Sequence, residues 1–240
     1  MKREDFLLEW FGVEGRELGT PERFFTTDPY SLIRRIETCR QTLSPLYVSV
    51  QPYRARDQPS ALEKLFFDFD CAADPGKAWL EAREFALTLK RFYGAEPFVT
   101  YSGGKGFHVY VFLEKAVEFV AGQVELARKV LEELQRRLLL GFKAETLDHS
   151  PIGDIKRLAR APFSFHEKTG SLCCPVDSER KPIIPDGLDT YRTLDAKLIS
   201  PIIKEMKLKE ETAPSKFKKI PKMTKRQVRP CIEAALNKPL

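Results

Sequence analysis

The hydrophobic and polar positions along the chain predict helices and strands that follow one another as far as about residue 203. Apolar residues at helical spacing predict helices over 5–11, 29–42, 74–93, 117–140 and 154–160. Apolar or alternating runs predict strands over 46–51, 64–70, 97–101, 107–113 and 171–176. Because two of these strands succeed each other like a hairpin, the pattern favours a mixed α+β fold over a doubly wound one.

Composition adds the expected class and compartment. The 240 residues are 42% hydrophobic and 11% aromatic, enough for a substantial core. No apolar run reaches the ~18–20 residues of a membrane span, and the N-terminal residues lack signal-peptide character. The five cysteines are scattered without a CxxC pair, so they indicate neither a disulfide framework nor a zinc site. We expect a cytoplasmic protein without a membrane partner.

The net charge of +6 is concentrated near the C-terminus. Residues 204–230 contain ten Lys or Arg and three acids, so the rest of the chain is close to neutral. This Lys- and Pro-rich composition is typical of a linker, although a grip on nucleic acid is an alternative. We therefore expect one domain over 1–203, a basic linker over 204–230, and the start of a truncated helical domain over 231–240.

The strand over 64–70 carries the first candidate chemistry. Alternation places Leu65, Phe67 and Phe69 on one face, and Asp68 and Asp70 on the other. The two Asp Cβ atoms should lie roughly 6–7 Å apart. Carboxylates at that separation repel each other unless a cation lies between them, which is the geometry of a metal site for phosphoryl transfer. An acidic strand end facing solvent is the ordinary alternative.

A glycine-rich turn joins the next two strands. Its sequence, Tyr101-Ser102-Gly103-Gly104-Lys105-Gly106-Phe107-His108, places three glycines within four positions. Such a turn lets backbone N–H groups converge on an anion, and Ser102 and Lys105 add a hydroxyl and a positive charge. The spacing is not that of a Walker A loop. The alternative is a flexible hairpin beside an ordinary surface histidine, His108.

A third group of polar residues follows Leu147-Asp148. If 154–160 is helical, Arg157 and Arg160 lie one turn apart and form a fork for phosphate oxygens. After Pro162, an extended segment carries Ser164, His166 and Lys168 on alternate positions. The alternative is a solvated basic turn. Asp148 gains meaning as a third ligand of a cation that Asp68 and Asp70 already hold.

The three motifs in this order resemble the archaeo-eukaryotic primase superfamily, specifically the catalytic small subunit of DNA primases. The similarity covers about residues 45–185 and comprises the hhhDhD strand, the SGGxGxH turn, and hD followed by RLxR-x-P-x-S-x-H-x-KTG. No zinc-binding insert is present, and His108 is close to Asp148 in sequence. A compact primase-polymerase of the mobile-element type is therefore the closer fit. The resemblance implies a two-layer α+β catalytic core with an RRM-like sheet and an active site in the cleft between sheets.

The resemblance also implies residue roles. The metal-binding and catalytic triad would be Asp68, Asp70 and Asp148, holding two Mg²⁺ or Mn²⁺ ions. The nucleotide-phosphate contacts would be Ser102, Gly103, Lys105, His108, Arg157, Arg160 and His166. Ser164 and Lys168 match the motif without an assigned role.

The activity implied is that of a nucleotidyltransferase, a DNA primase or primase-polymerase that starts primers on single-stranded DNA from nucleoside triphosphates. Such a protein would be associated with the nucleoid. The residues leave open a gap-filling repair polymerase of the same superfamily, a catalytically silent nucleic-acid-binding module, and a metal-dependent nuclease. Arg229-Pro230-Cys231-Ile232 is similar to the first cluster-binding cysteine of primase large subunits. The expected partners are therefore a large-subunit-like domain or subunit, or a replicative helicase.

Overall fold

A computed structural model of the protein describes residues 3–12, 15–19, 23–120 and 122–207. The helices are α1 (Arg3–Phe11), α2 (Pro29–Gln41), α3 (Pro75–Tyr93), α4 (Val124–Leu138) and α5 (Ala196–Met206). The first strands are β1 (Arg16–Gly19), β2 (Arg23–Thr26), β3 (Tyr47–Ser49), β4 (Tyr53–Ala55), β5 (Gln58–Pro59) and β6 (Ala61–Asp70). The later strands are β7 (Phe98–Tyr101), β8 (Gly106–Glu118), β9 (Leu147–Asp148), β10 (Leu158–Arg160), β11 (Cys174–Pro175) and β12 (Arg192–Leu194).

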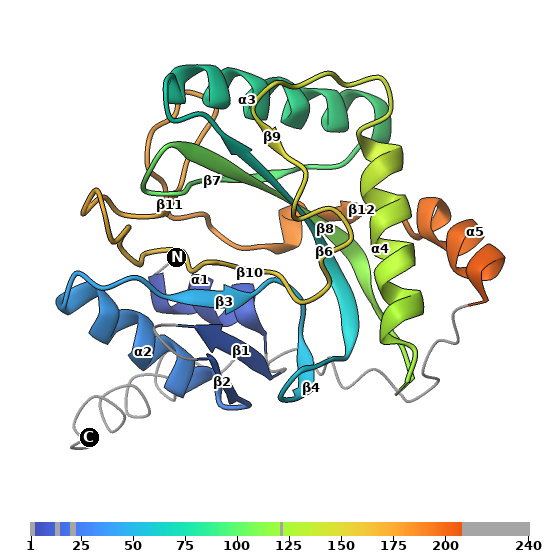
Figure 1. Ribbon diagram of the computed structural model, residues 1–240, viewed down its shortest axis with the longest axis horizontal. Helices are drawn as coiled ribbons and strands as arrows, with labels where there is room; N and C mark the ends of the chain where they lie inside the picture. The colour runs from blue at the N-terminus through green and yellow to red at the C-terminus, as the bar shows by residue number, and fades with distance from the viewer. Residues whose placement is uncertain (1–2, 13–14, 20–22, 121, 208–240) are drawn as a thin grey trace.

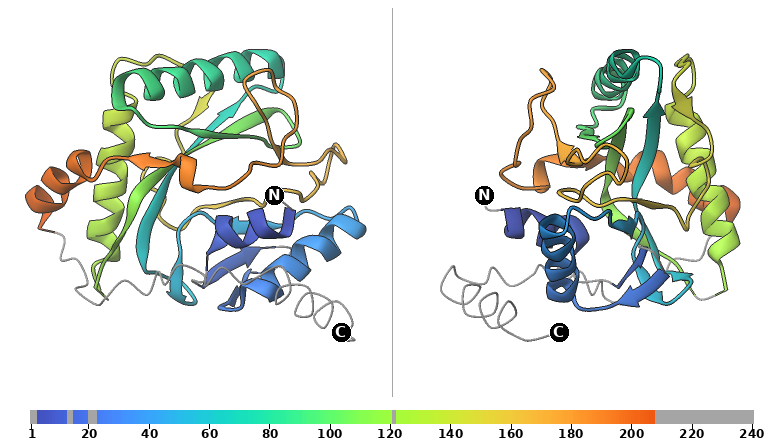
Figure 2. Two further views of the ribbon diagram at one scale, coloured as in Figure 1. Left: turned by 180° about the vertical axis from the view of Figure 1, so that it is seen from behind. Right: turned by 60° about the vertical axis from the view of Figure 1, so that its left-hand side comes forward.

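Two sheets form the body of the molecule. The larger has the order β11-β7-β8-β6-β9, with β12 added parallel to β8, and the smaller has the order β10-β3-β1-β2. Helices α3 and α4 pack on the larger sheet, while α1 and α2 belong to the layer of the smaller one (Figure 1). The two layers are separate in the turned views of Figure 2. The expected mixed α+β class is confirmed.

The central strand β6 is buried on both faces, which explains its almost unbroken apolar character. Leu65, Phe67 and Phe69 pack into a core with α3, α4 and α5. Phe66 faces the other way, into a second core formed with α1, α2, β3 and β10. Burial of aromatic and aliphatic side chains on both faces contributes most of the stability of such a strand. The strand end that carries Asp68 and Asp70 is therefore held between two cores.

Helix α3 has the ends that the sequence predicts. The Asp74 side chain accepts hydrogen bonds from the backbone N–H groups of Gly76 (2.9 Å) and Lys77 (3.1 Å). Gly94 ends the helix in the left-handed region with φ 64°. Both ends of the helix depend on residues that are close in sequence, so the sequence alone is enough to predict them.

One predicted helix begins later than expected and another is absent, because strand pairing takes precedence in both places. The helix predicted over 117–140 begins at Val124, because β8 continues to Glu118 and Val117 pairs with Leu62 of β6. The helix predicted over 154–160 is a turn followed by β10, whose Leu158 pairs with Ser49 of β3. The predicted strand over 171–176 is reduced to Cys174–Pro175, which pairs with β7.

Helix α5 packs on α4 and extends to Met206, so it includes the first three residues of the expected basic linker. The rest of that linker and the helical segment expected over 231–240 lie outside the described residues. Among the helices that the structure describes, none is long and apolar enough to cross a membrane.

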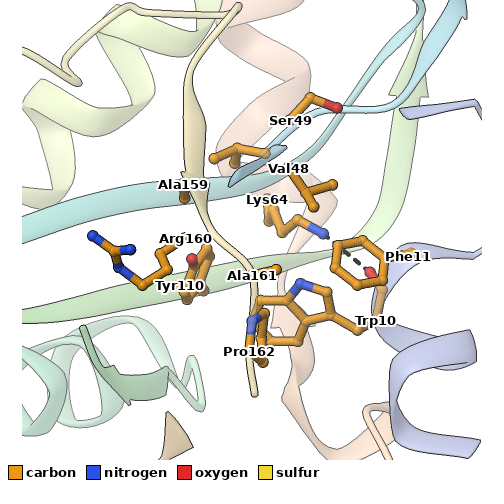
Figure 3. Close-up of a pocket in the computed structure, with 11 residues that line it drawn as sticks. Trp10, Phe11, Val48, Ser49, Lys64, Tyr110, Ala159, Arg160, Ala161 and Pro162 are labelled. Carbon is orange, nitrogen blue, oxygen red and sulfur yellow. Dashed lines mark hydrogen bonds between the residues drawn. The ribbon is translucent and has the colours of Figure 1, made fainter. Parts of the chain in front are cut away.

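A buried group of charged residues ties α1 to the start of β6. Arg16 donates to the carbonyl oxygens of Phe11 and Val50 and to Glu63 at 2.8 Å. Lys64 is 1% exposed, and its Nζ donates to Glu63 (3.2 Å) and to the Trp10 carbonyl (3.3 Å). Figure 3 shows this lysine pointing into a narrow crevice between α1 and β10. The hydrogen bonds fix the small layer against the central strand.

Lys64 makes the stability depend on pH. Burial, opposed by Glu63 and reinforced by Arg16, lowers the pKa of Lys64 to about 7. The unfolded chain has the ordinary, higher lysine pKa, so it binds more protons between pH 7 and 10, and stability rises with pH there. We predict that Lys64→Met removes this rise, which amounts to at most about 1.4 kcal/mol per pH unit.

Urea unfolding between pH 7 and 9.5 measures the effect. The exposed Lys115→Met serves as control and should keep the wild-type slope. If the free energy of unfolding rises with pH as steeply in Lys64→Met as in wild type, the lowered pKa of Lys64 is not the cause of the rise.

Candidate active site

Pairing of β9 with β6 brings the three predicted aspartates together. Asp148 lies directly opposite Asp68 in the antiparallel register. Asp70 follows two residues later on the same face of β6, and its backbone N–H donates to the Thr146 carbonyl at 2.7 Å. The aspartates, far apart in sequence, therefore occupy neighbouring positions at one end of the central sheet.

The aspartates are balanced by cationic side chains. Lys105 Nζ lies 3.0 Å from Asp70 Oδ2. One Arg157 nitrogen, Nη2, lies 3.7 Å from Asp68 Oδ2 and 3.8 Å from Asp148 Oδ2. The carboxylates thus share two cations that approach from the glycine-rich turn and from the segment before β10.

The carboxyl group of Asp68 is strongly perturbed by its surroundings. Burial, followed by the charge of Asp70, raises its pKa to about 7, although Arg157 opposes the shift. Its Oδ1 has no hydrogen-bond partner among the described residues. Burial alone would also raise the pKa of Asp148, but hydrogen bonds from Ser150 and the charge of Arg157 lower it. The site holds one carboxyl that is costly to ionise beside one that ionises readily.

The donor set fits a hard divalent cation. Carboxylate oxygens are the ligands that Mg²⁺ and Mn²⁺ prefer, and an unpaired buried oxygen on Asp68 is a vacant donor position. In the described part of the chain, however, no three His, Cys, Asp or Glu side chains are gathered closely enough to hold an ion as they stand. Lys105 and Arg157 supply the counter-charge in this arrangement. Binding of divalent ions at this site therefore requires the carboxylates to exchange these partners.

The glycines of the turn serve close packing. A Cβ atom at Gly106 would collide with Asp70 Oδ1 and the Phe69 carbonyl, and one at Gly104 would lie 2.6 Å from His166 Nε2. Gly103 has φ 84°, which disfavours other residues. The Thr169 hydroxyl donates to the Gly103 carbonyl, so the 165–170 segment is fastened over the turn. The sequence predicted the turn but not this packing.

His108 is buried on the face of β8 that looks toward Asp68. Its Nε2 lies 3.9 Å from Asp68 Oδ1, and its Nδ1 lacks a hydrogen-bond partner within the described part of the chain. Burial, followed by the charges of Arg160 and Arg157, lowers its pKa to about 3. The imidazole is therefore neutral near pH 7 and can donate or accept a hydrogen bond without carrying charge.

Arg157 and Arg160 reach the same cleft from extended backbone. Because 158–160 is a strand, the two arginines are not one helical turn apart as predicted. Arg160 is 7% exposed and donates to Glu167 (2.8 Å), the Phe165 carbonyl (3.1 Å) and the Tyr47 hydroxyl (2.7 Å). It is already neutralised by a carboxylate, which the sequence analysis did not anticipate.

These side chains line an open cleft of about 550 Å³ between the two sheets. Its lining residues are Tyr47, Phe66, Asp68, Asp70, Ser102, Lys105, His108, Arg157, Leu158, Ala159, Arg160 and His166. Of the predicted site residues, Asp148 and Gly103 are not part of this lining, although Asp148 adjoins it through Arg157. The hydroxyl of Ser164 is buried and donates to the Leu46 and Ala161 carbonyls, so its role is structural.

Several residues that position the site escaped the sequence analysis. Glu81 of α3 accepts hydrogen bonds from the Thr146 N–H (2.9 Å) and hydroxyl (2.7 Å), two residues before Asp148. Gln135 of α4 is 1% exposed, donates to the Phe66 carbonyl at 2.8 Å and accepts from the Gly153 N–H at 2.7 Å. The sequence did contain a signal for Gln135, because a glutamine on the apolar face of a helix usually has a buried hydrogen-bond partner.

The chain belongs to the LigD primase-polymerase domain family, whose sequence pattern matches residues 16–148, more than half of its length. The match includes the three aspartates and the glycine-rich turn, and ends before Arg157. No curated protein sequence matches the chain.

Two solved structures are similar. The primase-polymerase (AEP) domain of cyanophage S-2L is 17% identical with a TM-score of 0.48, over 79% of this chain and 97% of that chain. The polymerase domain of Mycobacterium tuberculosis Ligase D, solved in complex with DNA, is 14% identical with a TM-score of 0.49, over 84% of each chain. These likenesses are distant, and the family assignment rests on the sequence match.

The raised pKa of Asp68 predicts a second pH effect, opposite in sign to that of Lys64. In the folded protein this carboxyl stays protonated up to about pH 7, whereas in the unfolded chain it ionises near its ordinary pKa of 3.8. Stability should therefore fall as pH rises from 4 to 7 in the presence of EDTA. We predict that Asp68→Asn removes this fall and is more stable than wild type at pH 8, by on the order of 2 kcal/mol.

Thermal and urea unfolding at pH 5 and pH 8 test this. Asp74→Asn, which retains a helix cap, is the matched control and should behave as wild type. If Asp68→Asn loses stability with pH as steeply as wild type, another group is responsible.

Proposed function

We propose that this protein is a DNA primase-polymerase that transfers a nucleotide from an NTP or dNTP to a 3′-hydroxyl under the direction of a DNA template. It would start primers on single-stranded DNA for replication. The observation that carries the proposal concerns three carboxylates from β6 and β9 in a member of a primase-polymerase family. They lie together at an open cleft lined by Lys105, Arg157 and Arg160, with Asp68 and Asp70 in the lining and Asp148 beside it. A site that only binds polyanions gains nothing from three acids facing its ligand.

In this proposal the carboxylates of Asp68, Asp70 and Asp148 hold two divalent ions, Mg²⁺ or Mn²⁺. When bound, such ions lower the pKa of the attacking hydroxyl and neutralise the charge of the α-phosphate and the leaving pyrophosphate. The protein residues bind and orient the reactants, and no side chain serves as a nucleophile. Catalysis of this kind depends mainly on positioning and electrostatics.

The triphosphate would lie against the glycine-rich turn. Lys105 and His166 line the cleft beside this turn, and Arg157 and Arg160 face them from the smaller sheet. His108 is neutral, so it would donate a hydrogen bond to a phosphate oxygen instead of adding charge. Ser102 and the Gly103 backbone complete the proposed contacts. As the phosphates arrive, Lys105 would exchange its Asp70 partner for a phosphate oxygen.

Loss of the Asp70 carboxylate tests the proposal. We expect Asp70→Asn to reduce nucleotide incorporation on a primed template by at least about a hundredfold. Loss of a residue that only supports a metal ligand costs about 10–100-fold in activity, and this variant removes a proposed ligand itself. The fold should be retained, since the side chain is partly exposed and Lys105 is its ion-pair partner. Primer extension with Mg²⁺ or Mn²⁺ is the measurement, with a thermal melt to verify folding.

Glu133→Gln is the matched control, because it removes one carboxylate from an ion pair with Arg137 on α4. It should extend primers as wild type does. Extension by folded Asp70→Asn at the wild-type rate would refute the assigned role of the carboxylates.

A second candidate is a gap-filling repair polymerase. The family to which the chain belongs is named after the primase-polymerase domain of LigD, a ligase, which favours work on broken or gapped duplexes. The two candidates share the chemistry proposed above and differ in the nucleic acid that supplies the first 3′-hydroxyl.

Primer synthesis on unprimed DNA separates them. On circular single-stranded DNA, a primase makes dinucleotides and longer products from labelled ATP or dATP without a primer. We expect such products from the wild-type protein and none from Asp70→Asn. Filling of a short gap without synthesis on the unprimed circle would favour the repair polymerase.

A further inference from the structure

The segment 165–170 forms a strap between the two sides of the cleft. On the side of the larger sheet, Thr169 donates to the Gly103 carbonyl and His166 packs against Gly104. On the side of the smaller sheet, the Glu167 carboxylate contacts Arg160 of β10 at 2.8 Å and the Tyr47 hydroxyl of β3 at 3.4 Å. Glu167 does not itself line the cleft, but it places a negative charge against Arg160 and Tyr47, which do.

Arg160 has little room for a further partner. It is 7% exposed, its Nη1 donates to Glu167 and to the Phe165 carbonyl, and its Nη2 donates to the Tyr47 hydroxyl. Figure 3 shows its side chain pointing away from the Lys64 crevice. The Glu167 side chain, in contrast, is 42% exposed, so solvent reaches this partner of the guanidinium. A phosphate that approaches Arg160 from the cleft therefore meets a guanidinium to which a carboxylate is already bound.

Carboxylate and phosphate are competing ligands of one guanidinium. Both are oxyanions that accept two N–H bonds of the guanidinium fork. They also repel each other at short range, and more strongly in a partly buried site than in water. The two anions therefore compete for Arg160, and the free energy of the Arg160–Glu167 pair is subtracted from that of nucleotide binding.

We propose that Glu167 is an internal counter-anion of Arg160 that a bound nucleoside triphosphate displaces, and that it thereby sets the affinity of the site for nucleotide. This inference rests on the proposed function, because it requires the cleft to take a triphosphate. In the absence of nucleotide, Glu167 keeps Arg160 paired and the strap attached to the smaller sheet. With nucleotide bound, Arg160 contacts a phosphate and the carboxylate turns to solvent.

Substitution of Glu167 by glutamine tests the competition. Glu167→Gln retains the shape of the side chain and one acceptor for Arg160 but removes the charge. We expect its dissociation constant for dATP and ATP, measured by calorimetry with Mg²⁺, to be roughly five-fold lower than that of wild type, the scale of one partly exposed ion pair. In primer extension the KM for nucleotide should fall by the same factor with kcat unchanged.

The control is Glu133→Gln, which also removes one carboxylate from an arginine pair, on α4. It should bind nucleotide as wild type does. Inorganic tripolyphosphate is a second probe, because it lacks sugar and base, and its affinity should rise in Glu167→Gln by the same factor.

A double-mutant cycle with Arg160 tests whether the two residues act as a pair. In an Arg160→Gln background, Glu167→Gln should change the dissociation constant by less than two-fold, since the contested guanidinium is gone. If Arg160→Gln fails to fold, Arg160→Met serves instead, because it keeps the apolar stem of the side chain and also removes the charge.

The outcomes are distinguishable. Equal or weaker binding by Glu167→Gln, or the same gain with and without Arg160, overturns the competition while leaving the proposed function intact. Absence of triphosphate binding in wild type and in both variants overturns this inference and the proposed function together. A lower dissociation constant that depends on Arg160 supports the inference.

Discussion

The site depends on the pairing of β6 with β8 on one side and with β9 on the other. This pairing holds Asp68, Asp70 and Asp148 at one end of a strand whose remaining side chains are buried. Like charges at such a distance repel each other, and burial adds to the cost, as the raised pKa of Asp68 shows. The carboxylates can stay together because the strand cannot move: both of its faces are fixed in apolar cores.

The repulsion is balanced by cations from other parts of the chain. Lys105 comes from the turn between β7 and β8, and Arg157 from the segment that precedes β10 in the smaller sheet. Arg157 therefore adds electrostatic attraction between the two sheets, whereas Lys105 acts within the larger sheet, where it pairs with Asp70. The charged residues of the cleft therefore pair with one another and also help to hold the structure together. A metal ion or a phosphate that enters the cleft must replace one of these ion pairs.

Buried polar groups away from the cleft serve this balance. Gln135 satisfies the Phe66 carbonyl at a point where β9 is too short to pair with β6, and it holds the turn that leads to Arg157. Glu81 holds the start of β9. Arg16, Glu63 and Lys64 fix α1 at the other end of β6. Each group is hydrogen-bonded at a place where an unpaired polar atom would be costly.

The sequence by itself determined what depends on neighbouring residues. The alternation of β6 and the caps of α3 follow from local stereochemistry and short-range hydrogen bonds, and so does the glycine-rich turn. The order of the three motifs was enough to predict the family and its α+β class. Strand alternation was enough to pair Asp68 with Asp70. The resemblance was needed to add Asp148, because its distance in sequence gave no geometric reason.

Only the tertiary structure decided what depends on distant partners. Residues 117–118 and 158–160 were predicted as helix but are strands, because they form backbone hydrogen bonds with β6 and β3. The local sequence pattern cannot show that a remote strand is available for pairing. The same holds for the Glu167–Arg160 pair and for the neutral state of His108, since both arise from burial and charge that segments remote in sequence bring together.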